Sequence, residues 1–270
     1  MLSPHLLVCL LLAISWCVSA PSGAAPAVER DPLGHSTQMI VVTTSGWNAV
    51  EGRLRRYERV TAQENWRPVG EPISIVVGKN GLGWGIGIID DRGVRAAGDP
   101  VKKEGDGRSP AGVFALGTAF GYASDPLPGL KMPYLNLSPS IECVDDVGSK
   151  YYNRIVDRSV VAPDWNSSEK MRNTGESYRW GMVVDHNGTV REGETSPPEP
   201  GGGSCVFLHI WRSHDQGTAG CTAMSQVELE TLLTWLDPAR KPLLVQLPQP
   251  AYDGLGHRWM LPELIDVPLR

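Results

Sequence analysis

A cysteine and a histidine lie twelve residues apart near the end of the chain, in surroundings that favour covalent chemistry. Cys221 is flanked by small residues in the segment Gly217-Thr218-Ala219-Gly220-Cys221-Thr222, and His209 lies near the end of an apolar run. A thiolate attacks carbonyl carbon, and a nearby imidazole can take the thiol proton and return it to a leaving group. The pair therefore predicts nucleophilic acyl transfer.

Strand alternation assigns the neighbours of the histidine to two faces. In an extended segment, successive side chains point to opposite sides. If residues 204–211 are extended, one face carries Val206, Leu208 and Ile210. The other face carries Cys205, Phe207, His209 and Trp211. We expect the wholly apolar face to pack in the core, so the imidazole would emerge on the opposite face.

The segment around the thiol offers further groups for the same chemistry. The loop 213–220 is short and polar, and would fold Cys221 back towards the imidazole. Ser225 is a candidate helix N-cap four residues after Cys221, so the helix dipole would favour the thiolate. The amides of Gly220 and Cys221 are candidate oxyanion donors, because glycine permits close backbone approach.

Other roles for these residues stay open on the sequence alone. A lone cysteine is often buried and inert, and a lone histidine on a strand is often structural. A zinc site could draw on four side chains, those of Cys205, His209, His214 and Cys221. The absence of a CxxC or HExxH core disfavours zinc. His214 could replace His209 as the base. The order and spacing of His and Cys fit neither papain-like enzymes nor caspases.

Short apolar runs separated by turn signals predict a mainly β chain. The expected strands cover residues 38–44, 73–77, 85–89, 112–116, 180–185, 189–192, 204–211 and 243–247. The Asn187-Gly188 pair lies between two of these runs and predicts a hairpin. One clear helix is expected after the cysteine, because Ser225 and Glu228 form a capping box and leucines follow at helical spacing. Pro238 would end it.

The N-terminus predicts export. Residues 1–28 carry no Asp, Glu, Lys or Arg, and the apolar run 6–18 is too short to span a bilayer comfortably. Small residues follow this run, so we expect a signal peptide over 1–25, with an uncleaved anchor as the alternative. One domain would cover 36–248, followed by a C-terminal tail over 249–270. A net charge of −5 and the lack of a basic block argue against a nucleic-acid partner.

Several segments resemble one known family. His209 with Thr218-Ala219-Gly220-Cys221 resembles the signature of the L,D-transpeptidase catalytic domain family (YkuD/ErfK type), in which a His precedes Ser/Thr-His-Gly-Cys. Ser109-Pro110-Ala111-Gly112-Val113-Phe114 is similar to the family's Thr-Pro-x-Gly-x-Phe segment. The similarity is greatest to an exported proteobacterial branch, through residues 142–146, 151–154, 164–169 and 209–211. The resemblance covers about residues 39–247 and implies an L,D-transpeptidase-type β-sandwich.

The resemblance implies a periplasmic, monomeric cysteine enzyme that acts on peptidoglycan stem peptides. Cys221 would attack the carbonyl that joins the third-position diamino acid to the terminal D-alanine and form a thioester. His209, oriented by the backbone carbonyl of Ile210, would protonate the departing amine. A second stem would resolve the thioester in an L,D-transpeptidase, and water would do so in a carboxypeptidase or amidase. A non-catalytic wall-binding module is the alternative from another class. No cofactor, metal or membrane partner beyond the signal peptide is implied.

Two residues of the family pattern are missing from this chain. Ala219 stands in place of the second His, and no Arg follows shortly after Cys221. Arg212 or Arg154 could supply the positive charge for a substrate carboxylate. The side chains expected to contact substrate are Trp211, Arg212, Tyr152 and Arg154.

Two further cysteines lie outside the expected signal peptide. In an oxidising periplasm Cys143 and Cys205 would form a disulfide and leave Cys221 as the free thiol. Two buried thiols are the alternative. The acidic residues expected to order loops, and not to catalyse, are Asp145, Asp146 and Asp164.

Overall fold

The computed structural model describes residues 33–188, 190–191, 194–195 and 197–264. The expected signal peptide over 1–25 lies outside the described residues. So do the last six residues of the expected tail.

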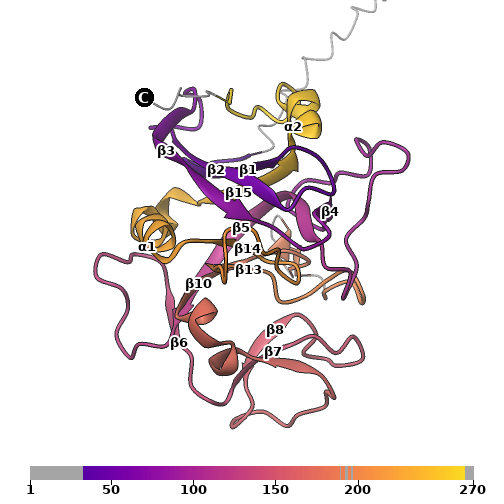
Figure 1. The fold of residues 1–270 in the computed structure, drawn as a ribbon, viewed down its shortest axis with the longest axis vertical. Helices are drawn as coiled ribbons and strands as arrows, with labels where there is room; N and C mark the ends of the chain where they lie inside the picture. Colours follow the sequence, from indigo (N-terminus) through magenta and orange to yellow (C-terminus); the bar gives the residue numbers. More distant parts are fainter. Residues whose placement is uncertain (1–32, 189, 192–193, 196, 265–270) are drawn as a thin grey trace, which may run out of the picture. The chain divides into compact units, whose positions relative to one another are not determined.

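The central feature of the fold is a sheet that closes on itself (Figure 1). In order around the sheet, its strands are β1 (Gln38–Thr44), β2 (Glu51–Glu58), β3 (Arg67–Val76), β14 (Thr222–Met224), β13 (Phe207–Ile210), β10 (Trp180–Val184), β5 (Ser109–Gly121) and β15 (Leu243–Pro248). β10 pairs with β5, and β15 pairs in parallel with β1, so the first and last strands meet. The expectation of a mainly β chain is confirmed. The main sheet closes as a barrel, and the expected L,D-transpeptidase-type β-sandwich is not confirmed.

Buried side chains explain why the barrel strands form. All seven residues of β1 are buried, which fits a β-branched run covered on both sides. β5 is the longest strand and joins both halves of the barrel, because Gly112–Ala115 pairs with β15 and Leu116–Gly121 pairs with β10. Two short strands also pair with β5, namely β4 (Leu82–Trp84) and β6 (Tyr134–Asn136).

Three local expectations about strands are wrong. The chain over 85–89 is not a strand, and β4 precedes it. β2 was not expected, because it is rich in charged residues and its two buried residues, Leu54 and Tyr57, lie three positions apart. Its pairing with β3 shifts register between Leu54 and Arg56, so no strict alternation is visible in the sequence. The Asn187-Gly188 pair does not close a hairpin onto β10. Instead β11 (Val190–Arg191) pairs with β12 (Glu194–Thr195), while β10 pairs with β13 and β5.

Two α-helices pack against the barrel. α1 (Gln226–Trp235) begins as expected, since the Ser225 hydroxyl accepts the amide of Glu228. α2 (Gln249–Leu255) forms in the expected tail and buries Tyr252 and Leu255, so this part of the tail packs in the domain core. The 3-10 turns are η1 (Met171–Asn173), η2 (Gly175–Tyr178) and η3 (Pro238–Arg240).

A small second sheet lies beside the barrel (Figure 1). Its strands are β7 (Ile141–Val144), β8 (Arg154–Asp157) and β9 (Ser168–Lys170). A disulfide between Cys143 of β7 and Cys205, just before β13, ties this sheet to the barrel. The two faces of the segment 204–211 follow this division: Val206, Leu208 and Ile210 belong to the barrel core, and Phe207 and Cys205 pack in the cluster under the small sheet. The predicted alternation is confirmed from Val206 to Ile210, whereas the strand begins only at Phe207 and Cys205 has a left-handed backbone, so the expected extended segment 204–211 is too long.

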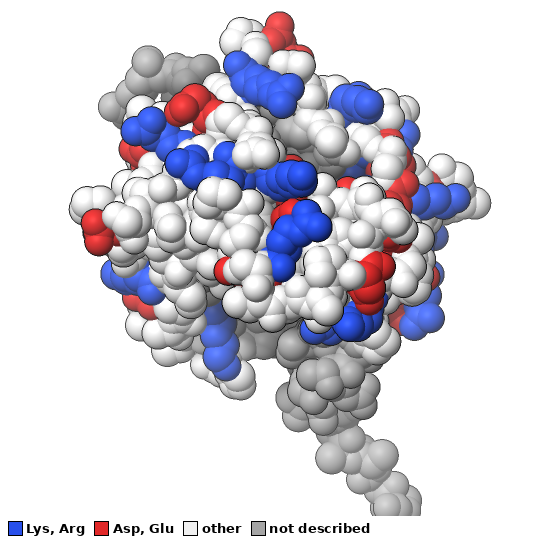
Figure 2. Space-filling view, turned by 90° about the horizontal axis from the view of Figure 1, so that it is seen from below, with Lys and Arg blue, Asp and Glu red and all other residues white. Residues whose placement is uncertain are grey.

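The described surface carries charges of both signs. Figure 2 shows Lys and Arg side chains lying among Asp and Glu side chains on one face of the protein. Within the described ranges, the helices are all too short or too polar to cross a bilayer.

Candidate active site

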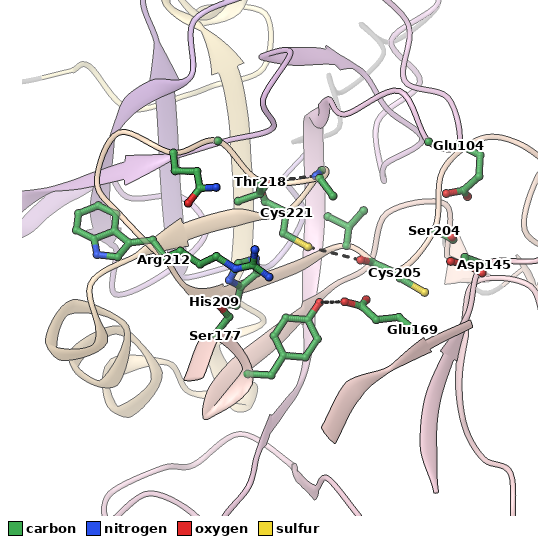
Figure 3. A pocket seen from close by; sticks show the side chains of 18 of the residues that line it. Glu104, Asp145, Glu169, Ser177, Ser204, Cys205, His209, Arg212, Thr218 and Cys221 are labelled. Atoms are coloured by element: carbon green, nitrogen blue, oxygen red, sulfur yellow. Dashed lines mark hydrogen bonds between the residues drawn. The ribbon is translucent and has the colours of Figure 1, made fainter. Parts of the chain in front are cut away.

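Cys221 and His209 share one cavity of about 530 Å³ between the barrel and the small sheet. Its walls come from the segments just before and after β13, the loop that leads to Cys221, the loop 102–105, the residue after β7, and residues of β13, β9 and η2. Figure 3 shows His209 and Arg212 on one side of the Cys221 sulfur, and Glu169, Asp145 and Glu104 on the other. The structure therefore brings together the two residues on which the predicted chemistry depends.

Backbone and hydroxyl groups hold Cys221 in place. The Sγ of Cys221 accepts the amide of Phe207 at 3.3 Å and donates to the carbonyl of Cys205 at 3.6 Å. The carbonyl of Cys221 accepts the hydroxyls of Ser109 at 2.8 Å and Thr218 at 2.6 Å. Ser109 begins β5 and is fully buried, which gives the Ser-Pro-Ala-Gly segment a direct role at the site. This segment carried part of the family resemblance, but no residue pattern pointed to the contact between Ser109 and Cys221.

The register of β13 and β14 sets the separation of the two residues. Leu208 pairs with Thr222 and His209 with Ala223, so Cys221 lies two positions before the partner of His209 and on the same face. Strand spacings place their Cα atoms about 8 Å apart, which two side chains can span. The Nδ1 of His209 bonds the carbonyl of Ile210 at 2.9 Å, the contact expected to orient the imidazole. The other nitrogen, Nε2, is then available to act as the base.

Burial keeps both groups neutral in the resting site. It lowers the pKa of His209 to about 4, and the charge of Arg212 acts in the same direction. Burial, followed by the charge of Glu169, raises the pKa of Cys221 to about 12. The amide of Phe207 and the charge of Lys102 oppose that rise. At neutral pH the site holds a thiol beside a neutral imidazole, which suits a general base and not a preformed ion pair.

Tyr178 and Glu169 line the cavity beside Cys221 and His209. The ring of Tyr178 lies 5.4 Å from that of His209, and its hydroxyl donates to Glu169 Oε1 at 2.7 Å. Burial raises the pKa of Glu169, and the charge of Asp145 adds to the effect. Glu169 lies within a segment used for the family resemblance, yet its role was not foreseen. Tyr178 carried no sequence signal.

A buried lysine also reaches the cavity. Lys102 has a side chain only 4% exposed, and its Nζ donates to Asp106 Oδ1 and to the carbonyl of Lys103, both at 2.7 Å. Its charge is therefore committed to Asp106. Tyr152, expected in the substrate groove, lies behind this region, where it is buried and donates to Glu104 Oε2 at 2.5 Å. Tyr152 supports the wall without lining the cavity.

The expected substrate-binding residues fall into two groups. Trp211 and Arg212 line the cavity. Arg154 is exposed at the start of β8 and does not line it. Arg212 is exposed, and among the described residues it has no hydrogen-bond or ion-pair partner. Of the two expected arginines, Arg212 is therefore the one that the structure places at the cavity.

The structure differs from two expectations about how the thiol is activated. The amide of Gly220 donates to Thr218 Oγ1 at 3.1 Å, so it is not free to hold an oxyanion in this arrangement. The strand β14 separates Cys221 from the start of α1, and the pKa of Cys221 is raised. The helix dipole therefore does not activate the resting thiol.

The alternative assignments meet specific obstacles. Cys205 is bonded to Cys143, so the four side chains of the zinc alternative are not available together. His214 is exposed and does not line the cavity, which places it away from the role of base. His186 is buried between Ile86 and Gly202, whose amide and carbonyl its ring nitrogens contact. The expected disulfide is present, and within the described chain Cys221 is the free cysteine.

The three acidic residues expected to order loops fall into two groups. Asp146 accepts the amides of Gly148 and Asn166, and Asp164 accepts the hydroxyl of Ser149, so these two order loops as expected. Asp145 differs: its Oδ1 is shielded from solvent and has no hydrogen-bond partner among the described residues.

No protein-family model, curated protein or solved structure matches this chain.

Proposed function

We propose that the protein is a cysteine acyltransferase, an L,D-transpeptidase of peptidoglycan stem tetrapeptides. The observation that carries the proposal is the shared cavity of Cys221 and His209, in which the Ile210 carbonyl fixes the imidazole. The sequence resemblance supplies the substrate class. The proposed site of action is the periplasm, after removal of the signal peptide.

The proposed reaction has two halves. His209 takes the thiol proton as Cys221 attacks the carbonyl of the third residue, and a C–S bond forms. Collapse of the tetrahedral intermediate breaks the C–N bond, and His209 returns the proton to the amine of the leaving D-alanine. An amine of a second stem then attacks the thioester, gives its proton to His209 and releases the thiol. Water in place of the amine makes the protein a carboxypeptidase or amidase.

A second candidate is a non-catalytic module that binds the cell wall. The observation that favours it is the burial of Cys221, which raises the pKa of the thiol and slows any reaction of the free protein. The retained His209–Ile210 contact favours the enzyme, because a binding module has no use for an oriented base.

Incubation with a tetrapeptide muropeptide and with a carbapenem tests the proposal. Mass spectrometry should find an acyl adduct on the protein, with loss of D-alanine from the muropeptide, and no adduct on Cys221→Ala. His209→Asn is the matched variant, since its amide can still donate to the Ile210 carbonyl but cannot act as a base. An adduct on Cys221→Ala, or none on the wild type, would reject the enzyme. A muropeptide dimer identifies the transferase, and free tripeptide identifies the hydrolase.

A further inference from the structure

One of the two backbone amides expected to hold an oxyanion is engaged elsewhere. The Gly220 amide donates to Thr218 Oγ1 at 3.1 Å, which leaves the Cys221 amide as the remaining backbone candidate. The tetrahedral intermediate of an acyl transfer carries negative charge on the former carbonyl oxygen, and preorganised donors aimed at that oxygen lower the barrier. The proposed reaction therefore calls for a further donor close to Cys221.

A buried ammonium group lies at this point of the cavity. Lys102 lines the cavity together with Gly220 and Cys221, and its side chain is 4% exposed. A Cβ atom at Gly220 would lie 3.8 Å from Nζ of Lys102, and one at Gly203 would lie 3.0 Å from its Cε. The lysine side chain thus runs past two glycines, and its charged end lies beside the residue that precedes Cys221.

The ammonium group has a donor to spare. Nζ of Lys102 donates to Asp106 Oδ1 and to the carbonyl of Lys103, both at 2.7 Å, and makes no third hydrogen bond within the described residues. An ammonium group carries three N–H donors. Its charge also acts on the thiol: burial and the charge of Glu169 raise the pKa of Cys221, and the charge of Lys102 opposes that rise. Lys102 therefore has both a free donor and an electrostatic effect at the reacting residue.

The loop that carries Lys102 does not depend on the ammonium group for its shape. Asp106 accepts the amide of Lys103 at 2.7 Å and the amide of Arg108 at 2.9 Å, and these two bonds close the loop through the backbone. A buried ion pair adds little stability over a well-packed nonpolar pair of the same size. Stability alone therefore does not account for a buried lysine at this position.

We propose that Lys102 is a catalytic residue that donates a hydrogen bond to the oxyanion of the tetrahedral intermediate. This inference rests on the proposed acyl transfer and adds an electrophilic group to it. As the C–S bond forms, the carbonyl π electrons move onto oxygen, where the third N–H of Lys102 and the Cys221 amide stabilise them. As the C–N bond breaks, the electrons return and the carbonyl forms again. Lys102 keeps its proton throughout, and proton transfer stays with His209.

The test separates attack on a carbonyl from a reaction of the same thiol that forms no oxyanion. A carbapenem acylates Cys221 through a tetrahedral intermediate, whereas iodoacetamide alkylates it by displacement at a saturated carbon. The rate of each reaction is measured separately by intact mass. The first variant is Lys102→Met, which keeps the length of the side chain and removes the ammonium group. Lys103→Met is the matched control, because it removes the same charge from an exposed side chain that does not line the cavity.

A second variant guards against a folding defect. Lys102→Met alone leaves Asp106 without its ion-pair partner, and an unpaired buried charge is costly. The double variant Lys102→Met, Asp106→Asn removes both charges of the pair. Circular dichroism and the thermal midpoint identify which variants are folded, and the rates are compared among those.

We expect the folded Lys102 variants to acylate about 100-fold more slowly than the wild type, the usual effect of removing one oxyanion donor, and to lose much less in alkylation. Lys103→Met should keep both rates. An equal loss in the two reactions would overturn the inference, because Lys102 would then act on the thiol or the fold alone. An unchanged rate of acylation would also overturn it and leave the acyl transfer standing. Alkylation of the wild type without any acylation would reject the acyl transfer, and this inference with it.

Discussion

The disulfide between Cys143 and Cys205 gives the sharpest prediction for stability. It closes a loop with a sequence separation of 62, so the chain-entropy model assigns it about 4 kcal/mol at 25 °C. The double variant Cys143→Ser, Cys205→Ser should lose that amount in the free energy of unfolding. With a slope of about 2–3 kcal/mol per molar urea, the unfolding midpoint should fall by about 1.3–2 M.

The assay is urea unfolding followed by tryptophan fluorescence and circular dichroism together. Coincident transitions are required before a free energy is derived. All proteins start after the expected signal peptide and carry Cys221→Ala, so that Cys9, Cys17 and Cys221 leave no thiol to exchange with the disulfide. Reduction of the Cys221→Ala protein is the matched control and should give the same fall as the two serines. A loss below about 1 kcal/mol in both would refute the reasoning, because the loop would then be held equally well without the bridge.

The same bond bears on the active site. Cys205 has a left-handed backbone with φ of 54°, and its carbonyl accepts the Cys221 thiol. The amide of Cys205 is held by the side chain of Asn153. The disulfide thus helps to fix the acceptor that orients the nucleophile. We therefore expect that removing the bridge in the protein with Cys221 intact lowers the rate of acylation. The rate is measured at a temperature where both forms are fully folded, so that unfolding does not contribute to the loss.

Three further predictions concern the site and the barrel. Because the base must be neutral, kcat/KM should fall as the pH drops through about 4, the pKa of His209, and should stay level from about pH 5 to 8. A fall in kcat/KM centred near pH 6.5 would contradict the burial of the imidazole. Ser109→Ala should cost about 1–3 kcal/mol in urea unfolding and reduce acylation, since its hydroxyl bridges the Gly78 amide and the Cys221 carbonyl; unchanged values of both would contradict this. Gly181→Ala should lower the free energy of unfolding by at least about 1–3 kcal/mol, because the new Cβ would lie 2.2 Å from the Phe120 ring. Gly117→Ala on the neighbouring strand should lower it less, because the nearest atom to its new Cβ lies at 3.5 Å. Equal thermal midpoints of the two variants would refute the packing argument.

Local pattern was enough to predict several elements. The apolar run of β1 and the Ser225 capping box depend on neighbours in sequence, and both elements begin where expected. The alternation from Val206 to Ile210 likewise predicted which side chains enter the barrel core. The site pair followed from residue type together with this alternation.

The rest depended on contacts between distant segments. Closure of the barrel requires β10 to pair with both β5 and β13, which no local pattern specifies. Glu169 reaches the cavity from β9 of the small sheet, and Tyr178 reaches it from η2, which packs against β13, so both depend on contacts between segments far apart in the sequence. The hairpin at Asn187-Gly188 failed for the same reason, because β10 has both its edges occupied by other strands.

The pairing of β1 with β15 has a consequence for the order of events during biogenesis. β1 lies between β2 and a strand that ends at Pro248, so its second edge has no partner until almost the whole chain has emerged. In a chain that emerges from its N-terminus, β1 and β5 form before β15. The edges of these two strands that β15 later occupies are therefore open until then. Such edges recruit other chains. These edges of β1 and β5 stay open until β15 pairs with both strands, so the incomplete chain is the form in which they are exposed to other chains.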